Sequence, residues 1–385
     1  MIIVFEPFCE GFEHSSFNAA FLQTVCLAYP DEEIRFYAEK EHLQLVSKWV
    51  CENDIKNITF YSLIIPNKNK TTNLKRIFQD IWTCFKMVRL TSKLGATKFI
   101  ISTISTHLLY TLKFIFPFYK NIKCFVIPHD ILQTITKKPV GLKANILWFK
   151  WALLFMTPPN LKILTLGSIT KKWLSKEIPK SKDFLLSIEM AYLFYNNKAE
   201  MNSNGNSIRF GFFGVGTIRK GADLFVKLSN DINSLHFDKK AEFVLIGKIV
   251  DEEINKMDKS SVIIPSSIHA LSRDDFSKYA KNIDYAIILY DRKFYDILQG
   301  ASIMDCLEFV KPVIALRTTF LEFFFSQMGD IGALCNNYDE VKKTIIELLQ
   351  SNQSDHYNQQ CQNMVSGRTM YTPGVLAKSY RETIQ

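Results

Sequence analysis

Four glycines and two adjacent cations in the run Phe210–Gly221 carry the clearest chemical signal in this sequence of 385 residues. Glycines let the backbone come close to a ligand, and the amphipathic run Ala222–Ile232 that follows is typical of a helix, whose start favours anions. Arg219 and Lys220 add positive charge at the same place, so the pattern predicts a phosphate site. The other interpretation is a glycine-rich turn with two solvated basic side chains.

Two better-known nucleotide loops fit this run less well. After Gly214-Val215-Gly216, Arg219 stands where a loop of the type Gly-x-Gly-x-x-Gly needs its third glycine. A Walker loop is excluded because no Gly-Lys-Ser or Gly-Lys-Thr follows at the required spacing.

A second run, Gln299–Ala315, places small residues at the start of a predicted helix that carries an acid and leads into a buried strand. Gly300, Ala301 and Ser302 would let a diphosphate approach the helix start, where the helix dipole favours negative charge. Asp305, one turn further along, would accept hydrogen bonds from ribose hydroxyls. The alternative is an ordinary helix N-cap with an exposed polar residue behind it.

In the first half, two polar loops follow predicted strands. Glu10–His14 lies between the opening strand and a helix, and His129-Asp130 follows a strand that ends at Pro128. Histidine beside aspartate has the chemistry to bind sugar hydroxyls or to relay a proton. The alternative for this pair is a loop histidine next to a helix-capping aspartate.

These loops require a framework, and short β-branched or aromatic runs alternate with amphipathic stretches along the chain. In the first half, the pattern predicts six strands: Ile2–Phe5, Ile34–Tyr37, Ile58–Ser62, Lys98–Ser102, Cys124–Ile127 and Lys162–Leu166. The clearest helices that it predicts there are Ser15–Ala28, Asn73–Lys93 and Ile169–Glu177. The second half repeats the alternation, with strands Ile208–Phe213, Glu242–Ile246, Val262–Ile264, Tyr285–Leu289 and Pro312–Ala315. We therefore predict the α/β class, with two Rossmann-like, doubly wound parallel-sheet domains that bind ligands beyond the carboxyl ends of their strands.

Length and composition also favour two domains. A chain of 385 residues exceeds the usual single domain of roughly 100–150 residues. Around residues 195–207 the composition shifts to Asn, Lys, Ser and Gly, as in an exposed linker. We expect an N-terminal domain over residues 1–190, a linker over 191–207 and a C-terminal domain over 208–365, with a helix in 366–385 crossing back to the first domain.

Three motifs follow one another in the second half. Arg219-Lys220-Gly221 ends the glycine-rich loop, the strand Phe243–Gly247 ends in glycine, and Asp305 precedes Lys311–Ala315, with Val310 before that lysine. Together they resemble the nucleotide-sugar-binding domain of glycosyltransferases with the two-domain GT-B fold, in particular the large "group 1" family of bacterial lipopolysaccharide, capsule and exopolysaccharide enzymes. That family has Gly-Lys-Pro-Val-Ile-Ala at the last motif, so Val310 replaces its glycine. The resemblance covers residues 208–350.

One position departs from the family pattern, which often has two glutamates seven residues apart. Counting back from Pro312 puts Asp305 at the second acid and Ile297 at the first, with Asp296 one position away. Some family members use a Ser/Gly-rich loop here instead, which Gly300–Ser302 resembles. The resemblance implies transfer with retention of the anomeric configuration.

The resemblance also implies a role for each motif. Arg219 and Lys220 would be catalytic, because they stabilise the charge that develops on the leaving diphosphate, and His129 would act with them. The donor-binding residues would be Gly216, Thr217, Gly247, His269, Gly300, Ala301, Ser302 and Asp305, with Asp305 on the ribose and His269 near the base. The acceptor-binding residues would be Gly11, His14 and Asp130. No metal and no cofactor are expected.

The expected function is that of a glycosyltransferase working in a cleft between the two domains. It would move a sugar from a UDP- or GDP-linked donor to a saccharide or lipid-linked saccharide acceptor in bacterial surface polysaccharide synthesis. Two alternatives stay open: a catalytically degenerate GT-B protein that binds a nucleotide sugar or a partner, and a nucleotide-sugar epimerase.

The net charge of +9 is concentrated in the first half of the chain. Residues 1–190 hold 25 Lys and Arg against 15 Asp and Glu, whereas residues 191–385 hold 22 against 23. Asn73–Lys93 predicts an amphipathic helix with a basic rim, and Leu108–Phe118 and Ile146–Met156 add aromatic-rich apolar stretches. Singly, each segment is as well explained by a core helix; together they predict contact with an anionic membrane surface.

Other classes are excluded. No zinc-finger or RNP motif supports nucleic-acid binding, and the eight scattered cysteines suit neither a zinc ribbon nor a disulfide framework. The longest nearly apolar run, Ile146–Met156, is too short to span a bilayer, and the N-terminus lacks the features of a secretory signal. We expect a cytoplasmic protein that is peripheral on the inner face of the cell membrane.

Overall fold

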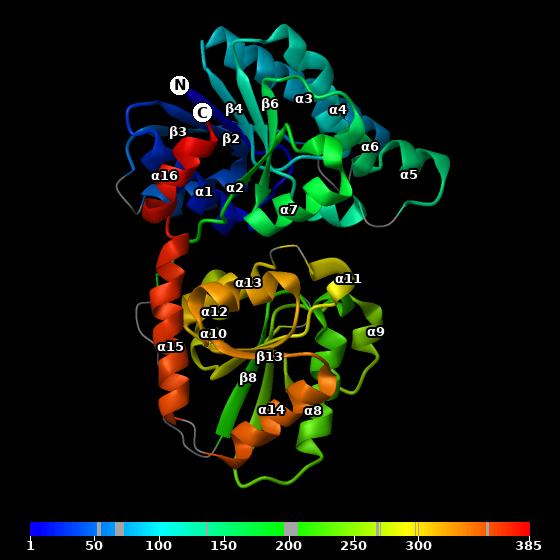
Figure 1. Ribbon diagram of the computed structural model, residues 1–385, viewed down its shortest axis with the longest axis vertical. Helices are drawn as coiled ribbons and strands as arrows, with labels where there is room; N and C mark the ends of the chain where they lie inside the picture. The colour runs from blue at the N-terminus through cyan, green and yellow to red at the C-terminus, as the bar shows by residue number, and fades with distance from the viewer. Residues whose placement is uncertain are drawn as a thin grey trace. The chain divides into compact units, whose positions relative to one another are not determined.

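The computed structural model describes residues 1–51, 55–65, 73–135, 138–195, 207–266, 269, 271–296, 298, 300–351 and 354–385, with the backbone alone for residues 130, 142 and 143. The chain forms two compact units, each built on one parallel β-sheet with helices on its faces (Figure 1). Unit 1 combines Met1–Leu193 with Tyr371–Gln385, and unit 2 is Phe194–Met370.

The sheet of unit 1 has seven strands in the order β3-β2-β1-β4-β5-β6-β7, with every neighbouring pair parallel. The strands are β1 (Ile2–Phe5), β2 (Ile34–Glu39), β3 (Ile58–Leu63), β4 (Lys98–Ile101), β5 (Lys123–Val126), β6 (Leu161–Leu166) and β7 (Leu185–Ile188). Ile2–Phe5 pairs with Ile34–Tyr37 on one side and with Lys98–Ile101 on the other, and its four side chains are buried. An uninterrupted apolar run is what a strand covered on both faces requires.

Helices cover both faces of this sheet. They are α1 (Ser15–Ala28), α2 (Lys40–Cys51), α3 (Asn73–Lys93), α4 (Thr106–Ile115), α5 (Leu142–Ile146), α6 (Phe149–Leu154), α7 (Ser168–Glu177) and α16 (Pro373–Thr383), with short 3₁₀ turns η1 (Phe116–Phe118), η2 (Asp130–Ile135) and η3 (Pro179–Ser181). The chain reverses its direction across the sheet after β3, so right-handed connections place α1 and α2 on one face and α3, α4, α6 and α7 on the other. Figure 1 shows α1, α2 and α16 on the opposite side of the sheet from α3, α4 and α6.

The last helix belongs to unit 1 because it packs on α1. The Tyr29 hydroxyl donates a hydrogen bond to the carbonyl of Ile384, and the Tyr380 hydroxyl donates to the carbonyl of Glu189 at 2.8 Å. The ring of Tyr380 lies 5.8 Å from that of Phe21. Tyr380 is fully buried, so these residues complete the core of the unit.

Unit 2 has a six-stranded parallel sheet in the order β10-β9-β8-β11-β12-β13. The strands are β8 (Ser207–Phe213), β9 (Lys240–Ile246), β10 (Val262–Ile263), β11 (Tyr285–Ile288), β12 (Val313–Leu316) and β13 (Gly332–Cys335). The helices are η4 (Ile218–Lys220), α8 (Ala222–Asn233), α9 (Glu252–Asn255), α10 (Arg273–Lys281), α11 (Arg292–Tyr295), α12 (Ser302–Phe309), α13 (Thr319–Met328), α14 (Tyr338–Gln350) and α15 (Ser354–Arg368), and η5 (Thr369–Tyr371) leads back to unit 1.

The two sheets share one topology. In each, the first strand is central, two strands extend from one side of it, and the chain then returns to its other side, so that switch points fall between β1 and β4 and between β8 and β11. The predicted α/β class with two Rossmann-like sheets is therefore confirmed. The predicted helices Ser15–Ala28 and Asn73–Lys93 have those bounds in the structure, but the last strand of each sheet, β7 and β13, was not predicted.

Candidate functional site

In unit 2, the loop after β8 is shaped by two glycines with positive φ. Gly214 (φ 97°) turns the chain at the carboxyl end of the strand, and Gly221 (φ 77°) opens α8. Between them Thr217 accepts a hydrogen bond from the Lys220 N–H at 3.2 Å, which closes the short turn η4. A Cβ on Gly221 would lie 2.1 Å from the carbonyl oxygen of Leu289. The loop therefore has a fixed shape that needs glycine at this position.

The backbone N–H groups of this loop bond to protein acceptors. Those of Gly214 and Gly216 donate to the carbonyls of Ile246 (3.0 Å) and Lys248 (2.8 Å), and that of Ile218 donates to the carboxylate of Asp251 (2.7 Å). Gly216 thus serves the loop by its small size and by its bond to the neighbouring strand end. These three N–H groups are therefore used within the protein, and the side chains of the loop add the positive charge that an anion needs.

Lys220 and Ser302 meet beside Gly214. A Cβ on Gly214 would lie 3.6 Å from the Lys220 Nζ and 3.9 Å from the Ser302 Oγ, so both polar atoms border the space that glycine leaves open. The Ser302 hydroxyl donates to the carbonyl of Phe213 at 2.9 Å, which fixes the start of α12 against the end of β8. A cation, a glycine turn and a helix start, where the dipole is positive, therefore come together at the switch point.

Arg219 lies at the outside of the same loop. Its side chain is exposed, and its guanidinium carbon is 4.6 Å from the ring centroid of Phe294 on α11. Its carbonyl accepts from the Asp291 N–H at 3.0 Å, which ties η4 to the end of β11. The stacking on Phe294 restricts the arginine without neutralising it.

Two more of the residues predicted to bind the donor are glycines against which other atoms pack closely. A Cβ on Gly247 would lie 2.0 Å from the carbonyl oxygen of Gly214, and one on Gly300 would lie 2.3 Å from the hydroxyl oxygen of Tyr290. Any side chain at these positions would displace a strand end or the buried tyrosine. Ala301, the N-cap of α12, is exposed.

Asp305 has a partner that the sequence did not reveal. The Arg273 Nη1 lies 3.0 Å from the Asp305 Oδ1, and the guanidinium also lies over the rings of Phe276 and Phe309. The charge-assisted hydrogen bond fixes the carboxylate on α12. A ribose bound by Asp305 would share that carboxylate with Arg273.

Three carboxylates surround the cationic loop. Burial raises the pKa of Asp223, and the nearby charges of Asp251 and Asp291 also raise it, against hydrogen bonds from backbone N–H groups at the start of α8. Asp291 caps α11 through the Lys293 N–H at 2.9 Å. The sequence analysis did not single out these acids because each one follows a different strand.

The remaining predicted residues of unit 2 lie apart from these contacts. His269 is exposed after β10, where its N–H donates to the Ser266 Oγ at 3.3 Å. Ile297 lies outside the described residues. Its neighbour Asp296 accepts from the N–H and hydroxyl of Thr319 at 3.0 and 3.1 Å, so its carboxylate anchors the start of α13.

In unit 1, the equivalent loop after β1 is built around the buried carboxylate of Glu6. It accepts hydrogen bonds from two backbone N–H groups, one amide and two hydroxyls: Phe8 (2.9 Å), Cys9 (3.1 Å), Asn18 (3.3 Å), Ser102 (2.7 Å) and Thr103 (2.8 Å). Burial alone would raise the pKa of Glu6, but the bonds from Ser102, Phe8 and Thr103 and the proximity of His42 together lower it below its ordinary value. Glu6 is therefore ionised and ties the ends of β1 and β4 together.

The network extends from Glu6 to the backbone of Gly11. The His42 Nδ1 lies 2.9 Å from the Gly11 carbonyl oxygen, and its Nε2 lies 2.9 Å from the Asn18 amide nitrogen. A carbonyl can only accept, so Nδ1 carries the proton and Nε2 accepts from the amide. Burial lowers the pKa of His42, which favours this neutral form. Gly11 (φ 52°) is therefore held by a chain of hydrogen bonds from the sheet.

His14 and His129 come together at this loop. His14 has a left-handed backbone (φ 49°), which is uncommon outside glycine, and its ring centroid is 4.6 Å from that of His129. Phe17 packs edge-on against His129 at 4.7 Å. The His129 Nε2 lies 2.8 Å from the carbonyl oxygen of Ser102, so in the neutral ring Nε2 carries the proton and Nδ1 the lone pair.

The structure thus brings together a group of the predicted residues in each unit, while His269 lies apart from the group in unit 2. Gly11, His14 and His129 lie together in unit 1, whereas the side chain of Asp130, which begins η2, lies outside the described residues. The sequence analysis missed Glu6, Asn18 and His42; the available signal was an acid directly after a fully apolar strand. Within the described part of the chain, no three His, Cys, Asp or Glu side chains are grouped as a metal site would require.

No protein-family model matches the sequence, and no curated protein matches it. Solved structures do match its fold over nearly the whole chain. WaaG, a glycosyltransferase involved in lipopolysaccharide biosynthesis, has 12% identity and a TM-score of 0.65, with 100% of both chains covered. Sucrose-phosphate synthase from Thermosynechococcus elongatus has 10% identity and a TM-score of 0.66, with 99% of this chain and 97% of that one covered.

A protein described as a putative UDP-N-acetylglucosamine 2-epimerase from Listeria monocytogenes has the same fold, with 13% identity, a TM-score of 0.55 and coverage of 98% and 94%. At these identities the similarity concerns the fold alone. This chain has the two-domain fold of GT-B glycosyltransferases, as its motifs predicted.

Proposed function

We propose that this protein is a glycosyltransferase that moves a sugar from a nucleotide diphosphate sugar, bound by unit 2, to a saccharide or lipid-linked saccharide acceptor bound by unit 1. The observation that carries the proposal is the convergence of Lys220, the Gly214 turn and the start of α12 at the switch point of unit 2. Such a place suits a diphosphate, because positive charge and a helix start meet there beside a glycine that has no side chain.

The chemistry assigned to unit 2 is stabilisation of the leaving group. When the bond between the sugar and the diphosphate breaks, negative charge grows on the phosphate oxygens, and Arg219 and Lys220 are the cations beside them. Hydrogen bonds to charged groups contribute about 1.5–3 kcal/mol each. Two of them supply much of the roughly 4–8 kcal/mol that holds a ligand in the millimolar to micromolar range. The proposal needs no metal ion or cofactor for this step.

The acceptor would lie over the loop of Gly11, His14 and His129. Imidazole rings bind neutral hydroxyl groups, and the rings of His14 and His129 lie 4.6 Å apart at this loop. As the acceptor oxygen bonds to the anomeric carbon, the bond from that carbon to the diphosphate breaks. The hydroxyl proton passes to His129 or to the departing phosphate, the second route giving retention.

The substrate class and setting belong to the same proposal. WaaG is involved in lipopolysaccharide biosynthesis, which supports a saccharide acceptor in bacterial surface polysaccharide synthesis. The donor that we propose with it is a UDP- or GDP-linked hexose. Such acceptors are built at the inner face of the cell membrane, so we place the protein in the cytoplasm at that surface. None of the helices in the described ranges combines the length and apolar character needed to cross a bilayer.

A second candidate function is nucleotide-sugar epimerisation, which the shared fold of the putative 2-epimerase favours. An epimerase would use the same diphosphate site but no acceptor. The third is a degenerate protein that binds a nucleotide sugar without converting it.

The first experiment is a thermal-shift titration with UDP, GDP, CMP and their common sugars. We expect one nucleotide to stabilise the protein and the double variant Arg219→Ala/Lys220→Ala to abolish the shift. Lys227→Ala is the matched control, since Lys227 lies on α8 in the same unit with its amine over the Tyr338 ring. Stabilisation that persists in the double variant would contradict the phosphate site.

Product analysis then separates the three functions. With donor and acceptor together, a transferase releases free nucleotide diphosphate and an extended acceptor. An isomerised nucleotide sugar without acceptor would identify the epimerase, and binding without any product would identify the degenerate protein.

A further inference from the structure

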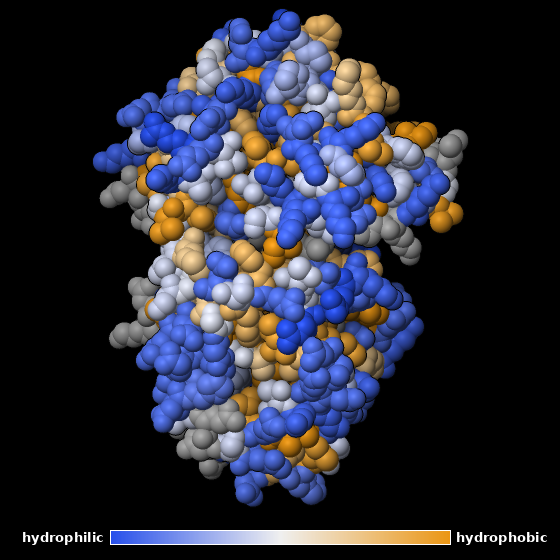
Figure 2. Space-filling view, in the orientation of Figure 1, coloured by the Kyte–Doolittle hydropathy of each residue, from blue (hydrophilic) through white to orange (hydrophobic). Residues whose placement is uncertain are grey.

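Unit 1 exposes large apolar side chains where α4 and α6 pack together. Phe114 on α4, Trp151 on α6, and Phe155 and Met156 after α6 form what we call the α4–α6 patch. Met156 is 79% exposed, Phe114 61% and Trp151 47%. The rings of Phe114 and Phe155 are 5.1 Å apart, so the patch is continuous, and Figure 2 shows exposed apolar residues near α5 and α6.

A buried cation, the Lys113 ammonium, fixes the backbone that carries part of the patch. The Lys113 ammonium donates to the carbonyls of Ala152 (2.5 Å) and Phe155 (2.8 Å) and approaches that of Leu153 (3.5 Å), which caps the end of α6. Burial lowers the pKa of Lys113 to about 8. The backbone at Phe155 is therefore fixed, and the exposure of its side chain is a feature of the folded unit.

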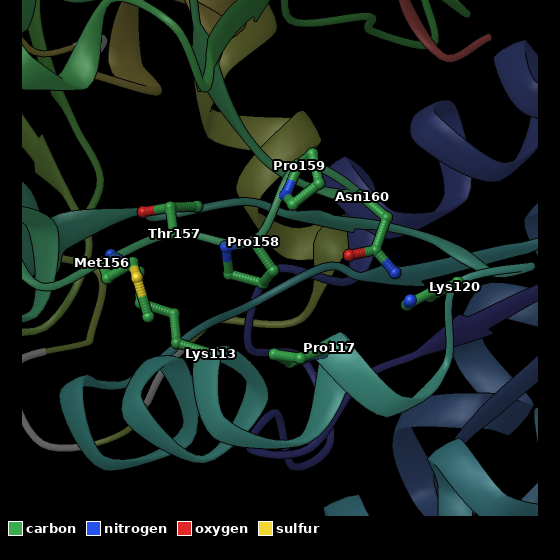
Figure 3. A pocket seen from close by; sticks show the side chains of 8 residues that line it. All are labelled: Lys113, Pro117, Lys120, Met156, Thr157, Pro158, Pro159 and Asn160. Carbon is green, nitrogen blue, oxygen red and sulfur yellow. The ribbon is translucent and has the colours of Figure 1, made fainter.

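A pocket opens beside the patch. It has a volume of about 440 Å³ and lies between the end of α4 and the segment that enters β6 (Figure 3). Met156 and Pro158 lie on one wall and Pro117 and Lys113 on the other, with Lys120 at the rim. The walls are largely apolar, so the space suits a hydrocarbon chain better than a sugar or a phosphate.

The stretch of sequence that contains the patch is strongly basic. Residues 81–176 contain 15 Lys and Arg but a single acid, Asp130. Lys120 is exposed at the pocket, and the Lys150 amine lies 5.5 Å from the ring centroid of Trp148 next to the patch. Unit 2 differs: among the described residues it exposes five large apolar side chains, whereas residues 74–156 of unit 1 expose twelve.

We propose that the α4–α6 patch docks on an anionic phospholipid bilayer, with its aromatic and Met side chains among the acyl chains, Lys120 and Lys150 at the headgroup phosphates, and one acyl chain in the pocket. Apolar residues rimmed by lysines are the composition of an interfacial membrane contact. A second copy of the chain is disfavoured as the occupant, because it would bring two basic faces together.

The position of the patch leaves the unit 1 site open. The end of α4 and residues 156–160 precede β5 and β6, so the pocket lies at the amino edge of the sheet. The loops of Gly11 and His129 follow the carboxyl ends of β1 and β5, at the opposite edge. A bilayer at one edge and an acceptor at the other can therefore be bound at the same time.

The test is co-sedimentation of the full chain with vesicles of phosphatidylcholine and phosphatidylglycerol in equal parts, and with phosphatidylcholine alone. We expect binding to the anionic vesicles that weakens with added salt. Lys120→Glu/Lys150→Glu should reduce the partition coefficient at least roughly 25-fold, taking about fivefold for each lysine lost from the surface. Trp151→Ser/Met156→Ser should reduce it by about tenfold through lost apolar burial.

Matched controls lie in unit 2. Lys240→Glu/Lys343→Glu and Val250→Ser/Ile263→Ser change exposed residues of the same kinds and should leave binding unchanged. Equal binding to both vesicle compositions, absence of binding to either, or the same loss in the controls would overturn the proposal; absence of binding would point to an acidic protein as the occupant. The patch variants should keep the nucleotide-induced thermal shift, and Arg219→Ala/Lys220→Ala should keep vesicle binding, so either proposal can fail without the other.

Discussion

The two switch points have the same topology but opposite chemistry. In unit 1 the loop after the central strand surrounds the buried carboxylate of Glu6, which accepts five hydrogen bonds. The rings of His14 and His129 lie together at this loop. In unit 2 the equivalent loop contains glycine where unit 1 has its acid, and it presents Lys220 and Arg219.

Under the proposed function, this difference would let one sheet order serve two substrates. The parallel strands bring corresponding loops to the same edge in both units, so topology would decide where binding occurs. The side chains would decide what is bound. A cationic, glycine-lined loop suits a diphosphate, and a loop with two imidazole rings over an internally hydrogen-bonded acid suits hydroxyl groups.

The largest expected effect concerns Lys220. Lys220→Ala should lower kcat/KM by about 10²–10³-fold, as expected when one preorganised donor to a developing oxyanion is lost. The melting temperature should change less than the rate, because the side chain is only half-buried. His129→Ala is the corresponding variant in unit 1 and should leave nucleotide binding unchanged. A wild-type rate in Lys220→Ala would show that Lys220 does not stabilise the leaving group.

Glu6→Gln tests the buried acid of unit 1. The neutral amide would turn an NH₂ group toward hydroxyl or amide donors, so the free energy of unfolding of unit 1 should fall by about 3 kcal/mol. Chemical denaturation with probes in both units would show the transition of unit 1 shifting while that of unit 2 stays. Glu33→Gln, at an exposed acid bonded to Arg35, is the control.

The stability of Glu6→Gln should also depend on pH differently from that of the wild-type protein. The pKa of Glu6 is lower in the folded chain than its ordinary value near 4.5, so its contribution to stability is complete above that value and is lost as the pH falls toward the folded pKa. The acid-induced loss of stability should therefore be smaller in Glu6→Gln. An unchanged slope between neutral pH and pH 3 would show that Glu6 does not titrate in this way.

Asp223→Asn should raise the stability of unit 2, whereas Glu6→Gln should lower that of unit 1. Burial and two neighbouring carboxylates raise the pKa of Asp223, so the ionised form is disfavoured in the folded chain. Removing its charge should stabilise unit 2 by about 0.5–1 kcal/mol and should tighten nucleotide binding. Asp339→Asn, at an exposed acid of α14, is the control, and a destabilised Asp223→Asn would show that its charge is needed.

An effect of similar size concerns the backbone at His14. His14→Gly and His14→Ala both remove the ring next to His129, but only alanine keeps a Cβ at φ 49°. The glycine variant should be more stable than the alanine variant by about 1 kcal/mol, and both should raise the acceptor KM while donor binding is retained. Equal stability of the two would show that the loop relaxes when the ring is absent.

Much of the framework could be predicted because several strands are continuous apolar runs and several helices have a clear amphipathic period. Ile2–Phe5 and Asn73–Lys93 are examples. The edge strands β7 and β13 were missed because their sequences, Leu-Leu-Ser-Ile and Gly-Ala-Leu-Cys, contain one β-branched residue and no aromatic residue between them. β13 also begins with glycine, which has low strand propensity.

The site could be predicted only where local sequence defines it. The Gly214–Gly221 loop is contiguous, and so was found. The pairing of Asp305 with Arg273, or of Glu6 with Asn18, Ser102 and Thr103, joins residues from separate elements. One sequence read along its length does not show which of many polar side chains meet across the sheet edge.

The return of the chain to unit 1 through α16 has a consequence for how the protein is made. Unit 2 is a continuous stretch, Phe194–Met370, and can fold as soon as it leaves the ribosome. Unit 1 must wait for Tyr371–Gln385, because Tyr380 and Ile384 fill its core. During synthesis the first domain to appear is therefore the last to be completed, and until then its unfinished surface against α1 is a natural place for a chaperone to bind.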